Sequence, residues 1–235
     1  MRSAIAIFLL TAGAVCLAAQ SPATQPGTTS QAPGTPAGDK ATPAAAGTQP
    51  VFTSDGGFSF SYPADWEVVD MKPMMPVQRL KAEQEAKSDL ERKGADCVEV
   101  QLTIRHGDPK SVILIMYLDY KCIGVELKPS DLGGTGVGIA QGLTKSFIVK
   151  EPKYGAYSLG KHAFWIERAD GSPVDHPESE YKLETACTLL TKGLTCWLAM
   201  AASPDAITSF EASNVSLEGD SPVALVPASA FAISK

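Results

Sequence analysis

The sequence lacks the short motifs by which many hydrolases are recognised. It contains no G-x-S-x-G, no H-E-x-x-H and no cysteine beside a histidine pattern. Its cysteines show no C-x-x-C spacing, which excludes the common four-cysteine metal site. The glycine-rich sequence GGTGVG at 133–138 fits neither the dinucleotide-binding spacing nor a P-loop. We therefore expect a protein that is not an enzyme and that needs no cofactor.

Runs of basic residues are also missing. With 20 Lys and Arg against 26 Asp and Glu the formal charge is -6, so nucleic acid and anionic lipid are poor partners. The apolar run after Arg2 is too short to span a bilayer, which takes about 20 residues. It precedes the small residues of 14–19. This order predicts a secretory signal peptide over 1–19, cleaved near Ala18 or Ala19.

Residues 20–50 contain no aromatic residue, leucine, isoleucine or valine. Such a segment cannot bury enough apolar surface to offset the entropy of ordering, so we predict a disordered Pro/Thr/Ala/Gly linker. A lipid anchor at Cys16 is disfavoured, because the three residues before it lack the leucine and the small last residue of such a site. The folded part is then a single globular domain over 51–235 of a secreted or periplasmic protein.

The rest of the domain is organised around 56–66, GGFSFSYPADW. Phe58, Phe60 and Tyr62 alternate with serines, which is the period of a strand with one buried face. Pro63 cannot donate to a sheet, and the Ala-Asp pair after it can form a bend before the tryptophan. The stretch predicts a hairpin or corner whose apolar face the remaining chain has to cover.

A glycine-led GFSFSYP..W near the start of a mature secreted chain resembles the PsbP-like family. That family includes extrinsic subunits of the photosystem oxygen-evolving complex and many bacterial envelope proteins. The likeness is sharp over 52–69 and topological afterwards. It implies an α+β fold, in which a mainly antiparallel sheet has helices packed on it as an α/β/α sandwich. The sequence contains no photosystem contact motif, so that specific role is not carried over.

Periodicity predicts two longer helices and several strands. A helix is expected over 77–93, where charges stand four apart, as in Lys81 and Glu85, and where Gly94 suits the end. A second helix over 131–147 contains five glycines, which fits close packing against the sheet. Strands are expected at 98–105 with one buried face, at 112–116 with both faces covered, around 162–166, and as a hairpin of 181–190 with 194–202; a short helix is expected over 206–214.

Four cysteines remain once the signal peptide is removed, and export favours disulfides. Pairing Cys187 with Cys196 across the last predicted hairpin also brings apolar residues opposite one another, so we expect that disulfide. If Cys97 pairs directly with Cys122, residues from opposite faces of the hairpin formed by the two strands between them would lie against each other. A bulge or a frayed strand end would remove this conflict. Free buried thiols and a crossed pairing remain open alternatives.

Histidines near carboxylates are the metal-ligand candidates. His106 lies two residues from Asp108, and Asp175, His176 and Glu178 share one loop. Nitrogen and oxygen ligands of this kind suit zinc or manganese, although solvated turns explain the same residues.

The function that follows is a non-enzymatic envelope protein that binds an unknown protein partner or assists assembly, as the resemblance implies. The loops 106–110 and 170–180 and the glycine-rich segment are the exposed places where a partner is expected. Two alternatives are a metal-dependent hydrolase of envelope material and a carrier with a small-ligand pocket between sheet and helix.

Overall fold

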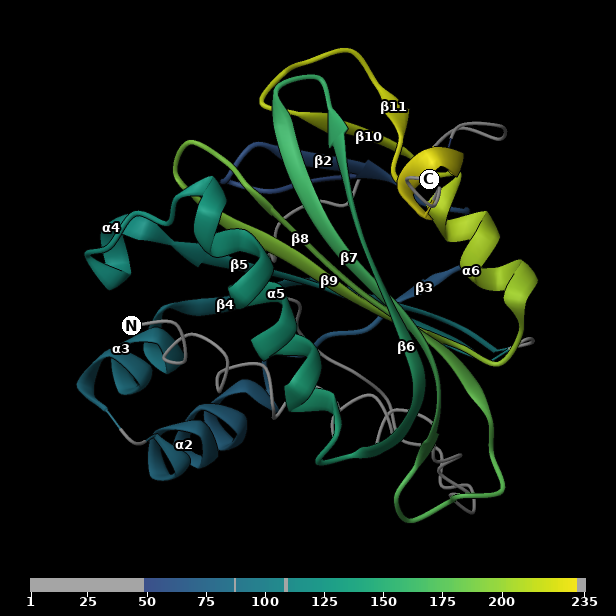
Figure 1. The fold of residues 1–235 in the computed structure, drawn as a ribbon, viewed down its shortest axis with the longest axis horizontal. Helices are drawn as coiled ribbons and strands as arrows, with labels where there is room; N and C mark the ends of the chain where they lie inside the picture. The colour runs from purple at the N-terminus through teal and green to yellow at the C-terminus, as the bar shows by residue number, and fades with distance from the viewer. Residues whose placement is uncertain (1–48, 87, 108–109, 232–235) are drawn as a thin grey trace, which may run out of the picture.

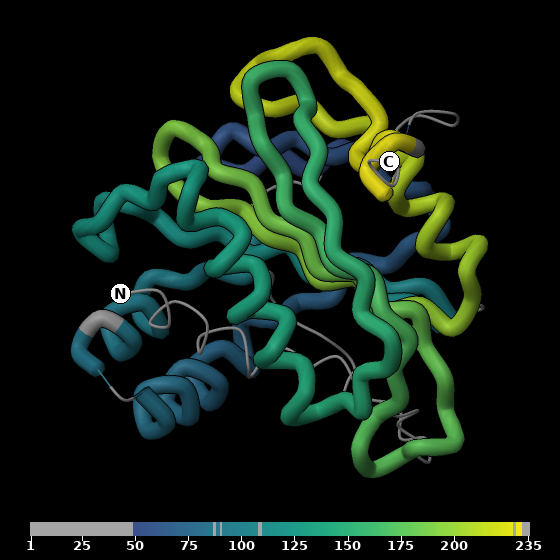
Figure 2. The backbone as a smooth tube through the Cα atoms, viewed as in Figure 1, coloured from purple at the N-terminus to yellow at the C-terminus, as the bar shows by residue number. Residues whose placement is uncertain are grey.

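The computed structural model describes residues 49–86, 88–107 and 110–231 (Figures 1 and 2). The predicted signal peptide, Cys16 and nearly all of the predicted linker lie outside the described residues, as does Asp108. The elements in chain order are β1 Val51–Thr53, β2 Phe58–Ser61, β3 Glu67–Val68, α2 Met75–Glu85, α3 Asp89–Cys97, β4 Val98–His106, β5 Ser111–Asp119, α4 Tyr120–Ile123, α5 Pro129–Leu143, β6 Phe147–Leu159, β7 His162–Pro173, β8 Tyr181–Leu189, β9 Gly193–Ala201, α6 Pro204–Glu211, β10 Asn214–Leu217, β11 Val223–Ala224 and the 3-10 helix η2 Ala228–Phe231.

Two antiparallel sheets form the frame of the molecule. Seven strands lie in the order β3-β4-β5-β9-β8-β7-β6, and four in the order β1-β2-β10-β11. Each neighbouring pair is antiparallel. Helix α5 covers one face of the large sheet, while α6 and the small sheet lie at the other face (Figure 1). The predicted α+β class is confirmed; the second sheet is an addition that the sequence did not reveal.

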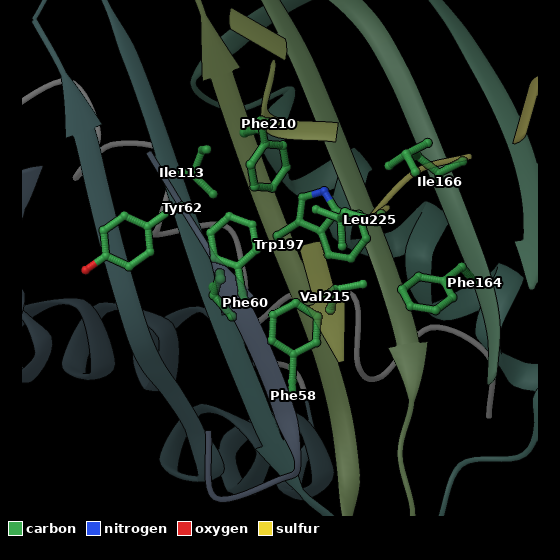
Figure 3. Packing of buried hydrophobic residues seen from close by; sticks show 14 of the residues in the cluster. Phe58, Phe60, Tyr62, Ile113, Phe164, Ile166, Trp197, Phe210, Val215 and Leu225 are labelled. Carbon is green, nitrogen blue, oxygen red and sulfur yellow. The ribbon is translucent and has the colours of Figure 1, made fainter. Parts of the chain in front are cut away.

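The central strands bury side chains on both faces, which produces two hydrophobic cores. In β5, Leu114 belongs to the core under α5, whereas Ile113 and Ile115 belong to the core under the small sheet. All residues of β5 but the last are buried, as predicted from its continuous apolar run. Figure 3 shows the second core, in which the Trp197 side chain lies among residues of both sheets.

The 56–66 stretch forms a corner and not a hairpin. Phe58 and Phe60 of β2 are 0% and 1% exposed, and β2 pairs with β1 and β10 of the small sheet. The next strand, β3, pairs with β4 of the large sheet. The chain therefore crosses from one sheet to the other at the Pro63 bend, and the half-buried Trp66 packs against the core that the two sheets share. The predicted burial of the aromatic face is confirmed.

The predicted single helix over 77–93 is wrong. The chain forms α2 and α3, and Ser88 begins the second helix because its side chain accepts the backbone N–H of Glu91 at 3.2 Å. Glu85, expected to pair with Lys81, instead accepts from Lys145 at 2.7 Å, which ties α2 to the end of α5. The helix also continues past Gly94 to Cys97.

A bulge in β4 decides which face each half of that strand presents. The pairing with β5 shifts between Val100 and Leu102. Val98 and Val100 consequently pack against the core under α5, while Leu102 and Ile104 enter the other core. The predicted single buried face is therefore wrong.

The first cysteine pair avoids the register problem because both cysteines lie outside the ladder of β4 and β5. Cys97 ends α3, and Cys122 lies in α4 directly after β5. The two are joined by a disulfide with a Cα–Cα distance of 5.6 Å. A frayed strand end was one of the two conditions under which the sequence allowed this pair.

The hairpin of β8 and β9 has the register predicted from sequence. Cys187 lies opposite Cys196, and the two form a disulfide with a Cα–Cα distance of 4.1 Å. Leu183 pairs with Met200, as the apolar pattern required. Two disulfides are typical of an oxidising compartment and indicate an extracytoplasmic location.

Among the described residues, no helix is long and apolar enough to cross a membrane.

The glycines of α5 permit a close contact with the large sheet. A Cβ at Gly136 would lie 2.1 Å from Cε3 of Trp165, so only glycine fits there without a shift. The helix ends at Leu143 and the next strand begins at Phe147, which corrects the predicted end at 147. The strand expected around 162–166 is the start of β7, which is the second arm of a long β6–β7 hairpin. This strand continues to Pro173, into the predicted 170–180 loop.

Candidate functional site

A cavity of about 770 Å³ opens between α6, η2 and the strands β6 to β8. We call it the α6 pocket. Helix α6 begins where Ser203 accepts the backbone N–H of Ala206, so this N-cap fixes one wall of the pocket. The pocket is lined by Glu151, Lys153, Tyr154, Arg168, Ala169, Asp170, Lys182, Leu183, Pro204, Ile207, Thr208, Glu211 and Phe231.

Two acidic side chains, Glu184 and Glu211, hold the arginine of the α6 pocket. Arg168 Nε donates to Glu184 Oε2 at 3.2 Å, and its Nη2 donates to Glu211. The guanidinium lies over the Phe231 ring, 4.1 Å from its centroid. Glu184 is 0% exposed and accepts from Trp197 Nε1 at 2.9 Å. Arg168 is thus held in place from three sides.

The pKa of Glu184 lies well above its ordinary value. Burial is the largest cause, because it penalises the charged carboxylate, and the hydrogen bond and charge of Glu211 add to it. The donors Trp197 and Arg168 oppose the shift without reversing it. Glu184 is therefore easier to protonate than an ordinary glutamate, and its charged form depends on the donors Arg168 and Trp197.

Charged and apolar residues both line the rest of the pocket. Lys182 donates to Asp170 at 2.5 Å across β7 and β8. Leu183 and Ile207 are buried at its edge, 4% and 8% exposed. A cavity with apolar walls and a few fixed charged groups is chemically suited to hold an amphipathic small molecule.

A second buried carboxyl, Glu167, lies on the opposite face of the sheet under α5. It is 6% exposed and pairs in register with Tyr154 of β6. Burial raises the pKa of Glu167 to about 7, and a hydrogen bond with Tyr154 offsets only part of this rise. This group changes charge near neutral pH, which is unusual for a glutamate.

The structure does not bring the predicted metal candidates together. Nδ1 of His176 lies 3.3 Å from Oε1 of Glu178 on an exposed loop, while His106 Nε2 lies 3.1 Å from Oδ2 of Asp65. Asp175 is exposed on the same loop as His176. Across 49–86, 88–107 and 110–231, no three His, Cys, Asp or Glu side chains are grouped so as to hold a metal ion.

His162 is the buried histidine, and it connects two distant turns. It begins β7 and is 5% exposed. Its Nε2 lies 3.5 Å from Oδ2 of Asp220 and 3.7 Å from Oε2 of Glu218, both after β10. Glu218 also accepts the Thr191 N–H at 2.6 Å. Burial opposes ionisation of Glu218, but Thr191 and the nearby cations outweigh it and hold its pKa below the ordinary value. The cluster fastens three turns together.

Sequence reasoning missed the residues that make the α6 pocket. Glu184 carried a usable signal, since it is the only charged residue in the run from Leu183 to Leu190. Such a residue in a fully buried strand needs a partner, and the strand pairing supplies Arg168 directly opposite. Glu211 of α6 gave no signal, because its contact with Arg168 depends on where the helix packs.

Fold and site together define an α+β protein with two disulfides and a pocket lined by both charged and apolar residues. No family model matches the chain, and no curated protein matches its sequence. Among solved structures, the fold is similar to the cyanobacterial PsbP (CyanoP) from Synechocystis sp. PCC 6803, at 12% identity and a TM-score of 0.41, over 73% of this chain and 89% of that one. It is also similar to LpqN of Mycobacterium tuberculosis, described as involved in cell envelope biogenesis, at 11% identity and a TM-score of 0.34, over 65% and 75%.

The first match is a PsbP protein, as the resemblance of the 56–66 stretch predicted. At these identities and TM-scores the likeness concerns the fold. It says nothing of the partner, ligand or activity of this chain.

Proposed function

We propose that this chain is an exported, non-enzymatic binding protein and that the α6 pocket is its binding site. The observation that carries the proposal is the cavity of about 770 Å³, which lies within the size range of small-molecule sites. It combines apolar walls with an arginine held by Glu184 and Glu211. A positioned charge next to apolar surface gives both affinity and orientation to a bound molecule.

Secretion or periplasmic location supports this function. The 1–19 segment has the order of a signal peptide, and two disulfides join the four remaining cysteines. A binding protein in that compartment meets envelope components and molecules that enter from outside.

The test compares the wild type with a variant whose pocket is filled. Thr208 lines the α6 pocket and is exposed on α6, so Thr208→Trp places an indole in the cavity. Ser209→Trp adds the same bulk at the next position, which does not line the pocket. Each protein is purified from the envelope fraction, and its bound small molecules are extracted and identified by mass spectrometry.

We expect the wild type and Ser209→Trp to retain a molecule that Thr208→Trp lacks. Added back at 100 times its Kd, that molecule stabilises the folded state by about 2.7 kcal/mol. For a domain of this size the gain raises the Tm by about 5 to 10 °C. Equal retention by Thr208→Trp and the wild type would contradict the pocket as the binding site.

A second candidate function is recognition of an envelope protein, and α2 provides the observation that favours it. Val77 and Leu80 are 68% and 56% exposed and stand three residues apart, which puts them on one face of that helix. Affinity capture from the envelope fraction with the wild type and with Val77→Ser/Leu80→Ser tests this function. A partner that enriches equally on both would contradict it.

The alternative of a metal-dependent hydrolase stays a prediction. Metal analysis of the purified protein and of His176→Ala tests it: stoichiometric metal that is lost in the variant would favour a hydrolase over a binding protein.

A further inference from the structure

Most charges that line the α6 pocket are matched inside it. Arg168 is neutralised by Glu184 and Glu211, and Lys182 is paired with Asp170. Two lining residues of opposite sign remain, Glu151 and Lys153 of β6. Within the described chain neither side chain takes part in an ion pair or a side-chain hydrogen bond. The pocket therefore presents one unmatched negative and one unmatched positive group.

The backbone of β6 places these two groups in a particular way. The register with β7 shifts between Lys150 and Lys153, so the strand contains a bulge. Glu151 lies in this bulge with a φ of 48°, in the left-handed region that side chains other than glycine disfavour. Bulges re-aim side chains, and a strained residue of this kind clusters at functional sites.

Lys153 rejoins the ladder directly opposite Arg168, on the same face of the sheet. Two cations side by side repel each other, and the two glutamates satisfy only Arg168. An anionic group next to Lys153 would relieve that repulsion. The unmatched Glu151 stands two residues earlier, within the bulge.

We propose that the α6 pocket binds a short peptide with free termini and apolar side chains, its ammonium at Glu151 and its carboxylate at Lys153. The proposal rests on the proposed function and names its ligand class. A short peptide with free termini carries one ammonium and one carboxylate, the two charges that Glu151 and Lys153 would match. The apolar side chains pack on Ile207 and Phe231.

The test uses calorimetric titration of the mature protein with three forms of one peptide. Leucyl-phenylalanine has both charges, its N-acetyl form keeps the carboxylate alone, and its amide keeps the ammonium alone. The protein variants are Glu151→Gln and Lys153→Gln. Lys150→Gln is the matched control, because Lys150 is paired with Glu180 at 3.0 Å and does not line the pocket.

We expect the wild type and Lys150→Gln to bind the free peptide at least tenfold more tightly than either capped form. Glu151→Gln loses the preference over the N-acetyl form, and Lys153→Gln loses the preference over the amide. Equal binding of capped and free peptides would overturn the proposal, as would variants that leave both preferences unchanged. Binding of glycerophosphoethanolamine in place of the peptide would overturn it too, since that molecule carries the same two charges on a lipid headgroup.

Failure of this proposal differs from failure of the proposed function. When no peptide binds but Thr208→Trp still loses a molecule retained from the envelope, the ligand is of another class and the pocket remains the binding site. When Thr208→Trp behaves as the wild type, both proposals fall.

Discussion

Two alanine substitutions in α5 distinguish a packed glycine from an unneeded one. Gly136 faces Trp165, and a Cβ there would lie 2.1 Å from Cε3 and 2.4 Å from Cδ2 of the indole. At Gly134, on the same helix, a Cβ would meet nothing within 4 Å. Both changes gain the same helix propensity, about 1 kcal/mol over glycine. Their difference in stability therefore isolates the contact with the sheet.

The magnitude follows from how far the indole has to move. Ordinary contact begins at 3.4 Å, so the ring must shift by roughly 1.3 Å. Trp165 is 8% exposed and lies against Tyr154, with 5.9 Å between ring centroids. Overpacking of a core costs about 1 to 3 kcal/mol and sometimes more. After the gain in helix propensity is subtracted, we expect Gly136→Ala to destabilise the protein by up to about 2 kcal/mol and Gly134→Ala to stabilise it by up to about 1 kcal/mol.

Urea unfolding followed by circular dichroism measures both effects with the disulfides intact. A net difference of 2 kcal/mol corresponds to about 4 to 8 °C in Tm. Trp165→Phe in the Gly136→Ala background should recover part of the loss, because the smaller ring leaves room for the methyl group. Gly136→Ala that is as stable as Gly134→Ala would refute the close contact as the reason for glycine in this helix.

Three further predictions concern buried charge and covalent links. The raised pKa of Glu167 makes the folded state hold a proton that the unfolded state has lost, so wild-type stability falls as the pH rises from 4.5 to about 7. Glu167→Gln lacks this fall, and its stability relative to the wild type should increase by about 1 to 3 kcal/mol between pH 4.5 and 8, as urea titrations measure; a constant difference would contradict the shift. Arg168→Met leaves Glu184 buried without its cation and should cost about 3 kcal/mol, part of which Glu184→Gln restores in the double variant; additive losses would contradict the network. Cys97→Ala/Cys122→Ala opens a link between residues 25 apart and should cost about 3 kcal/mol by denaturant unfolding, and an unchanged midpoint would contradict that disulfide as a stabilising link.

Local pattern was sufficient wherever a residue's neighbours in sequence set its environment. The alternation of Phe58 and Phe60 predicted a buried aromatic face, and the apolar register of β8 and β9 predicted that Cys187 lies opposite Cys196. Both succeed because the two-residue period of a strand fixes the face of each side chain.

The predictions from sequence were wrong where a local pattern was overridden by a cap, a bulge or a distant contact. Charges spaced four apart favoured one helix over 77–93, but the Ser88 cap and a contact from α2 to the distant Lys145 break it into two. The bulge after Val100 also had no clear local mark, and it moved half of β4 to the other core.

The sequence by itself predicted the sheet-rich domain and the aromatic face of the corner, which the structure confirms, because each depends on short-range periodicity and composition. The export signal, read from the same kind of local pattern, stays a prediction. Only the tertiary structure decided the α6 pocket. Arg168, Glu184 and Glu211 come from β7, β8 and α6, and they meet because strand pairing and helix packing bring them to one face of the sheet. The cost of leaving a buried charge without a partner then keeps them together.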